Sequence, residues 1–167
     1  VRELQKRSYN VLHSLSVDYL GIYQVNVDTG ECEIYRDSTR MEMDWAANFE
    51  DGYQTAMERY ISQYAAHRDQ ERLRAVTKKD YVLAQIGARK KFSVRYQMKD
   101  NPHGLKHLEI HFSATGKTEE ENCVIFALRD INAVVEQEEK YKLEARRSLE
   151  DILEGARTGI WTIELEE

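Results

Sequence analysis

Three histidines are the first residues whose spacing suggests chemistry, because His103, His107 and His111 follow one another at intervals of four. On a helix this spacing would place three imidazoles on one face, where they could share a metal ion. Pro102 and Gly104 instead predict a turn at His103, and the alternation that follows predicts a strand. Four strand residues span about 13 Å, too far for two ligands of one metal ion. We therefore expect polar positions on a sheet and no metal site.

Aromatic residues in the middle of the chain are the candidates for a ligand site. Their helical spacing would place several hydroxyl groups and a thioether side by side, and a later strand offers a cation and an amide for a small polar or anionic ligand. The alternative is that the aromatic stripe packs a core and that the arginine is exposed. The candidate pocket residues are Trp45, Tyr53, Met57, Tyr60, Tyr64, Arg95 and Gln97.

Motifs for catalysis are missing from the sequence. It holds no Walker loop, no G-x-G-x-x-G, no H-E-x-x-H and no ordered Ser, His and Asp set. The run Glu119–Glu121 is typical of a solvated loop tip, and the spacing of Asp130 and Glu136 does not favour acid–base work. Cys32 and Cys123 form no C-x-x-C pair, which predicts neither a disulfide framework nor a zinc ribbon. We expect a chain that is not itself an enzyme.

Composition limits the class of protein further. The 167 residues are 41% hydrophobic and 32% charged, which suffices for one domain with a core. The mean hydropathy is −0.69, and no apolar run approaches the ~20 residues of a membrane span. The net charge of −6 disfavours nucleic-acid binding. These features predict a domain without membrane insertion, and the two unpaired cysteines fit a reducing cytoplasm.

The elements that would position these residues begin with a flanking helix over residues 1–16, whose apolar face holds Leu4, Val11, Leu12 and Leu15. Residues 19–27 and 32–36 predict two strands joined by a turn at 28–31. Helices follow around Tyr53, then around Leu73 and Val76, and then from Asp80, a candidate N-cap, to a break near Gly87.

Three more strands and a long helix complete the prediction. Residues 92–99 and 108–112 alternate between apolar and polar, and the continuous apolar run 123–128 predicts a strand covered on both faces. A charged helix is expected over 132–156. The segment Gly159–Leu165 then repeats the pattern of Gly21–Val27, which predicts the first strand of a second domain.

The order of elements resembles the PAS fold, over roughly residues 10–132. Gly21–Gly30 is similar to the first strand and Asp-x-x-Gly turn of that family. His67-Arg68-Asp69 resembles its His-Pro-Asp pattern, with Arg68 where proline is usual. Arg129-Asp130-Ile131-Asn132 resembles the Asp-Ile-Thr junction before the signalling helix, with Asn132 where threonine is usual. More narrowly, the chain is similar to sensory-box modules upstream of bacterial diguanylate cyclase or histidine kinase domains.

The resemblance implies an α+β fold: a five-stranded antiparallel sheet with helices on one face. The expected organisation is a flanking helix (1–16), a PAS domain (17–132), a linker helix (133–157) and the start of a truncated second PAS domain (158–167). The implied function is sensing or signal relay in two-component or cyclic-di-GMP signalling. A change caused by a ligand or partner would reach the output domain through the junction of Asp130, Ile131 and Asn132.

Cofactors and partners follow from the same resemblance. Haem-binding relatives use a helical histidine, and His67 is the one candidate here; flavin-photoadduct relatives need an Asn-Cys-Arg context, which both cysteines lack. We expect no cofactor, although an unknown small molecule remains open. The expected partners are a second copy, through the flanking helices, and a downstream PAS and output domain in cis. Two alternatives stay open: a ligand-free PAS module for dimerisation and spacing, and a small isomerase or hydrolase.

Overall fold

The computed structural model describes residues 19–37, 44–116 and 121–165, and these form an α+β fold with one antiparallel sheet. The predicted flanking helix (1–16) and residues Glu119 and Glu120 of the acidic run lie outside the described residues. The chain divides into two units, residues 1–131 and 132–167, which are described separately.

Five strands build the sheet of the first unit. They are β1 (Tyr19–Asn26), β2 (Cys32–Arg36), β3 (Lys91–Gln97), β4 (His107–Ala114) and β5 (Cys123–Asp130). Their order is β2-β1-β5-β4-β3, and every neighbouring pair is antiparallel. The first and last strands of the unit therefore pair beside each other, with β2 and β3 at the edges.

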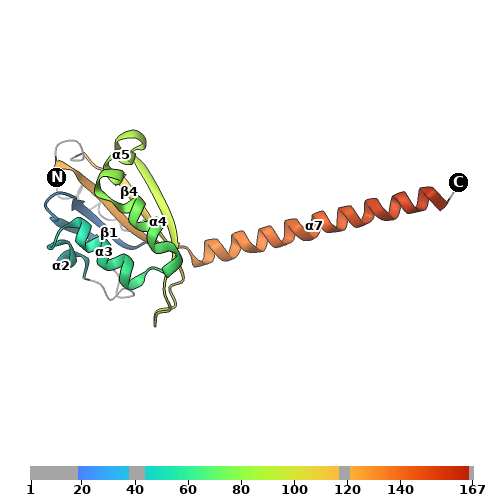
Figure 1. Ribbon diagram of the computed structural model, residues 1–167, viewed down its shortest axis with the longest axis horizontal. Helices are drawn as coiled ribbons and strands as arrows, with labels where there is room; N and C mark the ends of the chain where they lie inside the picture. Colours follow the sequence, from blue (N-terminus) through green and yellow to red (C-terminus); the bar gives the residue numbers. More distant parts are fainter. Residues whose placement is uncertain (1–18, 38–43, 117–120, 166–167) are drawn as a thin grey trace, which may run out of the picture. The chain divides into compact units, whose positions relative to one another are not determined.

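Four helices lie between β2 and β3 in the chain and pack on one face of the sheet (Figure 1). They are α2 (Trp45–Phe49), α3 (Tyr53–Tyr64), α4 (His67–Thr77) and α5 (Lys79–Arg89). Because side chains alternate along a strand, every second side chain points toward these helices. The inward set is almost fully buried: Val94, Tyr96, Leu108, Ile110, Phe112, Val124, Phe126 and Leu128.

The other face of the sheet carries polar residues, among them Arg95, Glu109 and His111. On this face Cys123 and Ala127 of β5 are also buried, at 5% exposure each. The prediction that β5 is covered on both faces is confirmed at these positions.

Two details of α5 differ from the sequence prediction. Asp80 lies in its first turn, and the N-cap is Lys78, whose carbonyl accepts from the Val82 amide at 2.9 Å. Gly87 does not end the helix, because hydrogen bonding continues to the Lys90 amide, which donates to Ile86 O at 2.9 Å. Lys90 itself adopts the left-handed conformation at φ 65° that closes the helix.

The turn from β1 to β2 fits closely against the helical layer. The Asn26 carboxamide oxygen accepts from the amides of Asp28 and Thr29, at 2.9 and 3.0 Å. Gly30 has φ +79°, and a Cβ there would lie 2.2 Å from the carbonyl oxygen of Phe49. Only glycine fits this position, which fixes the hairpin against the end of α2.

The second unit is the helix α7 (Asn132–Leu165), of 34 residues and about 51 Å at 1.5 Å per residue. The strand predicted over Gly159–Leu165 is wrong, because this segment is helical. A strand needs a neighbour for its backbone groups, whereas a helix pairs them within itself. None of the described helices is both apolar and long enough to cross a membrane.

Candidate functional site

The candidate site is the aromatic cluster between the helices and the sheet. The Asp44 carboxylate accepts from the Ala47 amide at 3.0 Å and starts α2, which places Trp45 over the sheet. Trp45 is 1% exposed, and its ring lies 4.8 Å from Tyr60 and 4.9 Å from Phe126 between centroids. The helix start thus fixes an indole at the centre of the interior.

The helix α3 supplies the next part of the cluster, because its 3.6-residue period turns Tyr53, Met57 and Tyr60 toward the sheet. All three are at most 1% exposed. The Tyr53 hydroxyl donates to Thr77 O of α4 at 2.7 Å. Tyr64, one turn beyond Tyr60, is only partly buried and lies 5.3 Å from the Tyr60 ring.

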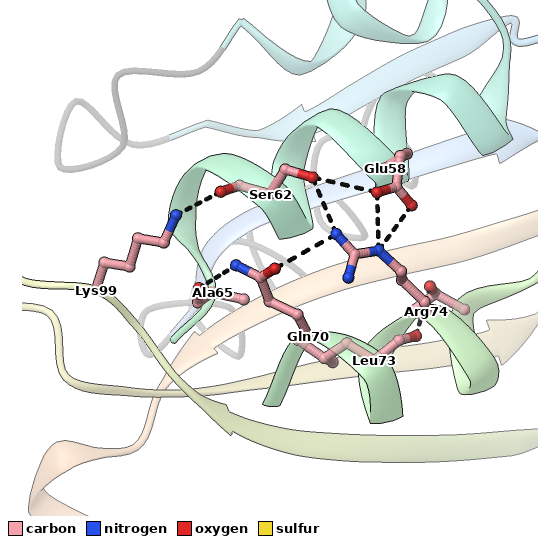
Figure 2. A network of polar contacts seen from close by, with 8 residues as sticks. Glu58, Ser62, Ala65, Gln70, Leu73, Arg74 and Lys99 are labelled. Carbon is pink, nitrogen blue, oxygen red and sulfur yellow. Dashed lines mark hydrogen bonds and ion pairs between the residues drawn. The ribbon is translucent and has the colours of Figure 1, made fainter. Parts of the chain in front are cut away.

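A polar network on the outer side of α3 holds the helix in this orientation (Figure 2). Arg74 of α4 pairs with Glu58 through Nε at 2.8 Å and donates through Nη2 to the Ser62 hydroxyl at 3.1 Å. Lys99 donates to the carbonyl oxygen of Ser62 at 2.5 Å, from the hairpin that follows β3. The network links α3 to α4 and to the segment after β3, on the side of the helix away from its buried tyrosines.

Two phenol groups meet inside the cluster. The hydroxyls of Tyr60 and Tyr96 share a hydrogen bond, and both rings are buried. Burial raises the pKa of Tyr60, Tyr96 and Tyr53 far above the usual value for a phenol. These hydroxyls therefore stay protonated at physiological pH and act as hydrogen-bonding groups rather than as bases.

The Trp45 indole nitrogen is buried and has no hydrogen-bond partner among the residues that the structure describes. Burial of an unpaired donor costs about 1–3 kcal/mol, so such a group calls for an explanation. It is the one chemical irregularity of an otherwise apolar or internally paired cluster among the described residues.

The seven predicted pocket residues do not form one site. Trp45, Tyr53, Met57 and Tyr60 come together and pack against one another in the interior. Arg95 and Gln97 alternate with the inward-facing Tyr96, so they lie on the opposite face of the sheet. Sequence reasoning missed Tyr96, although its alternation with Val94 was a usable signal. It also missed Tyr23, which lies 6.0 Å from Trp45 between ring centroids.

Two hollows on the surface lie away from the aromatic cluster. One of about 180 Å³ lies beside β2 and includes Glu31, Glu33 and Glu121 in its lining. Another, of about 470 Å³, is an open depression on the outside of α3, next to Gln54 and Glu58. Neither includes any of the predicted pocket residues.

Arg95 belongs to a polar cluster on the second face of the sheet, in which sequence reasoning missed Glu109. Glu109 is 7% exposed; it accepts from Arg95 Nε at 2.9 Å and lies 2.5 Å from His111 Nε2. Burial alone would raise the pKa of Glu109, but the hydrogen bonds and positive charges of Arg95 and His111 outweigh it and lower that pKa. The edge of the His111 ring meets Tyr19, 5.7 Å away between centroids.

The remaining candidates lie in a turn, in strands and at the start of a helix. His103 lies in the turn after β3, while His107 and His111 lie in β4, as the alternation predicts. His67 begins α4. Burial raises the pKa of Cys32 to about 11, which makes its thiol a poor nucleophile at neutral pH. Within the described part of the chain, no three His, Cys, Asp or Glu side chains gather as metal ligands.

The predicted signal junction lies where the sheet ends. Asp130 is opposite Leu108 in β4, and the Ile131 amide donates to His107 O at 3.0 Å. Ile131 is 1% exposed, and α7 begins at Asn132. The role of Asn132 as a cap and the pairing of Asp130 with a basic side chain stay predictions.

The hydroxyl groups of the interior can donate hydrogen bonds, and the charged residues of the second face pair with one another. The described interior holds no carboxylate or imidazole for proton transfer.

Comparison with protein-family models, with curated proteins and with solved structures finds no match to this chain.

Proposed function

We propose that the chain is a PAS-type relay module of a cytoplasmic signalling protein, which passes a change at its sheet to an output domain through α7. The observation that carries the proposal is the path from sheet to helix. Strand β5 lies at the centre of the sheet, Ile131 is anchored to His107 O, and a 34-residue helix begins at the next residue. An antiparallel sheet with helices on one face fits the resemblance.

The same geometry favours partner-driven relay over sensing of an interior ligand. The predicted pocket residues on α2 and α3 fill the interior against one another, at 1% exposure or less. A ligand between helices and sheet would have to displace this packing. The unpartnered indole nitrogen of Trp45 supports ligand sensing as the second candidate, because a small molecule with an acceptor would satisfy it.

The proposed partner for relay is a second copy, which joins through α7. Leu149, Ile152 and Leu153 follow at i, i+3 and i+4 and are 58%, 67% and 56% exposed. Together they form an apolar stripe on a helix that is exposed from residue 136 to 157. Burial of this stripe in a parallel pair would let two copies move as one unit.

Light scattering on the chain at high micromolar concentration tests the relay. We expect a dimer that dissociates when Leu149→Glu and Ile152→Glu are combined, because two carboxylates would enter the seam. Leu143→Glu is the matched control, since Leu143 is 47% exposed on another side of the same helix. A monomeric parent chain, or a double variant that keeps the parent's oligomeric state, would contradict relay through α7.

A further inference from the structure

The two edges of the sheet differ in how their backbone groups are satisfied. At β3, the outward Gln97 amide donates to the Asp69 carboxylate at 2.8 Å, and the Ala66 amide donates to Gln97 O at 2.8 Å. The Arg95 carbonyl oxygen accepts from Arg72 at 2.6 Å. The start of α4 therefore closes the end of this edge at Arg95 and Gln97 in place of a sixth strand.

The edge of β2 has no such cover from the described residues. Asn26 and Glu31 form a hydrogen-bonded pair, and the register continues through Val25↔Cys32, Gln24↔Glu33 and Tyr23↔Ile34. Antiparallel pairs alternate, so the amides and carbonyls of Cys32 and Ile34 point away from β1. Among the described residues, no hydrogen bond pairs these backbone groups, and the Ile34 side chain is 45% exposed.

A negatively charged hollow lies on the face of the sheet next to β2 and reaches across β1 to the start of β5. The hollow, of about 180 Å³, is lined by Glu31, Glu33 and Glu121, by Gln24 and Asn26, and by the two cysteines. Within the described part of the chain, the ion pairs include none of these three carboxylates. The site therefore combines backbone groups that can pair with a strand and a charge that selects one kind of side chain.

We propose that the β2 edge binds an extended segment of a partner protein that carries a lysine or arginine opposite Glu33. The segment would add a sixth strand, and its backbone would pair with Cys32 and Ile34. A residue opposite Glu33 belongs to a non-hydrogen-bonded pair, in which side chains come closest. A long cationic side chain from this position reaches over β2 toward the carboxylates. A second copy of β2 fits less well in this register, because it would place Glu33 against Glu33 of the other copy.

The proposal does not rest on relay through α7 and is tested separately. The probe is the capped peptide acetyl-Thr-Val-Thr-Lys-Thr-Val-Thr-amide, titrated into the chain while amide chemical shifts are followed. We expect shifts that concentrate on residues 32–35 and leave β3 unchanged. The same peptide with glutamate at its centre should bind at least about tenfold more weakly, or about 1.4 kcal/mol. N-methylation of the amides that face β2 should abolish binding, whereas N-methylation of the outer amides should not.

Charge reversal supplies the decisive variant. Glu33→Lys should reverse the preference, so that the glutamate peptide binds better, and Glu71→Lys on α4 is the matched control, because Glu71 is also exposed. Equal binding of both peptides, shifts at β3, or no shifts at all would overturn the proposal. Concentration-dependent shifts at β2 without peptide would also overturn it, because they would assign the edge to a second copy.

Discussion

The two faces of the sheet are stabilised by different interactions. Toward the helices, Phe126 lies within 6.1 Å of the rings of Tyr23, Trp45 and Phe49, and this face is closed by aromatic packing. On the second face, a nearly buried carboxylate is held by one guanidinium and one imidazole. The comparison shows that a single sheet uses non-directional burial on one side and directional, charge-dependent contacts on the other.

We expect the largest loss of stability when a ring is removed from the aromatic face of the sheet. Phe126→Ala should lower the free energy of unfolding by about 3–5 kcal/mol, because it leaves a cavity at the centre of the ring cluster. Urea unfolding followed by circular dichroism measures the loss. Ile125→Ala is the matched control, since Ile125 is the next residue of β5 and faces the other way. A loss for Ile125→Ala as large as that for Phe126→Ala would remove the distinction between the faces.

The contact between hairpin and helical layer gives the second effect. Gly30→Ala should cost about 2–3 kcal/mol, because it adds a Cβ at positive φ and against the Phe49 carbonyl oxygen. Gly104→Ala is the control: its φ is +68°, but a Cβ there meets nothing within 4 Å. Thermal unfolding should show a clearly smaller loss for Gly104→Ala. Equal losses would mean that backbone strain alone, and not the close approach, decides the cost.

The charged residues on the second face of the sheet predict that the free energy of unfolding depends on pH. The folded state lowers the pKa of Glu109 below its ordinary 4.5, so its contribution is present above that pH and is lost as the pH falls through the folded pKa. Glu109→Gln should cost about 1–2 kcal/mol at pH 7 and should flatten this part of the acid profile. Urea unfolding between pH 7 and the acid range measures both effects. If the free energies of unfolding of parent and variant changed with pH in the same way, the Glu109 carboxylate would contribute no pH-dependent stability.

The smallest effect is expected at the exposed network outside α3. Glu58→Gln removes an ion pair with Arg74 whose side chains are 51% and 37% exposed. Solvent and salt screen such pairs, so the loss should be at most about 1 kcal/mol and should shrink as ionic strength rises. Chemical unfolding at low and high salt checks this. A loss that is large and independent of salt would make Glu58 part of the aromatic scaffold.

The strands were largely predictable, because each residue's face follows from a period of two. Residues 32–36 form a strand with the predicted bounds, and the inward set of β4 matches the alternation of Leu108, Ile110 and Phe112. The same period places Arg95 on the other face of β3 from its neighbour Tyr96, and therefore outside the interior. The inclusion of Arg95 and Gln97 in the candidate site was wrong, because the prediction did not ask which face of the sheet these two residues occupy.

Other features depend on contacts that sequence patterns do not encode. The helix α5 continues past Gly87 to Arg89 because its hydrogen bonding continues to the Lys90 amide. Residues 159–165 have a strand-like composition but form a helix. The pairing of Glu109 with Arg95 requires the register of two strands, which depends on the hairpin between them.

The strand order also has a consequence for how the chain can fold during synthesis. Strand β1 forms its hairpin with β2 early, but its other neighbour is β5, roughly a hundred residues later. At bacterial and eukaryotic translation speeds this delay is about 5–20 s, during which one edge of β1 has no native partner. The pairing of β1 with β5 joins residues far apart in the sequence, and such non-local strand pairing forms slowly. The nascent hairpin therefore exposes an unpaired edge of β1 until β5 emerges.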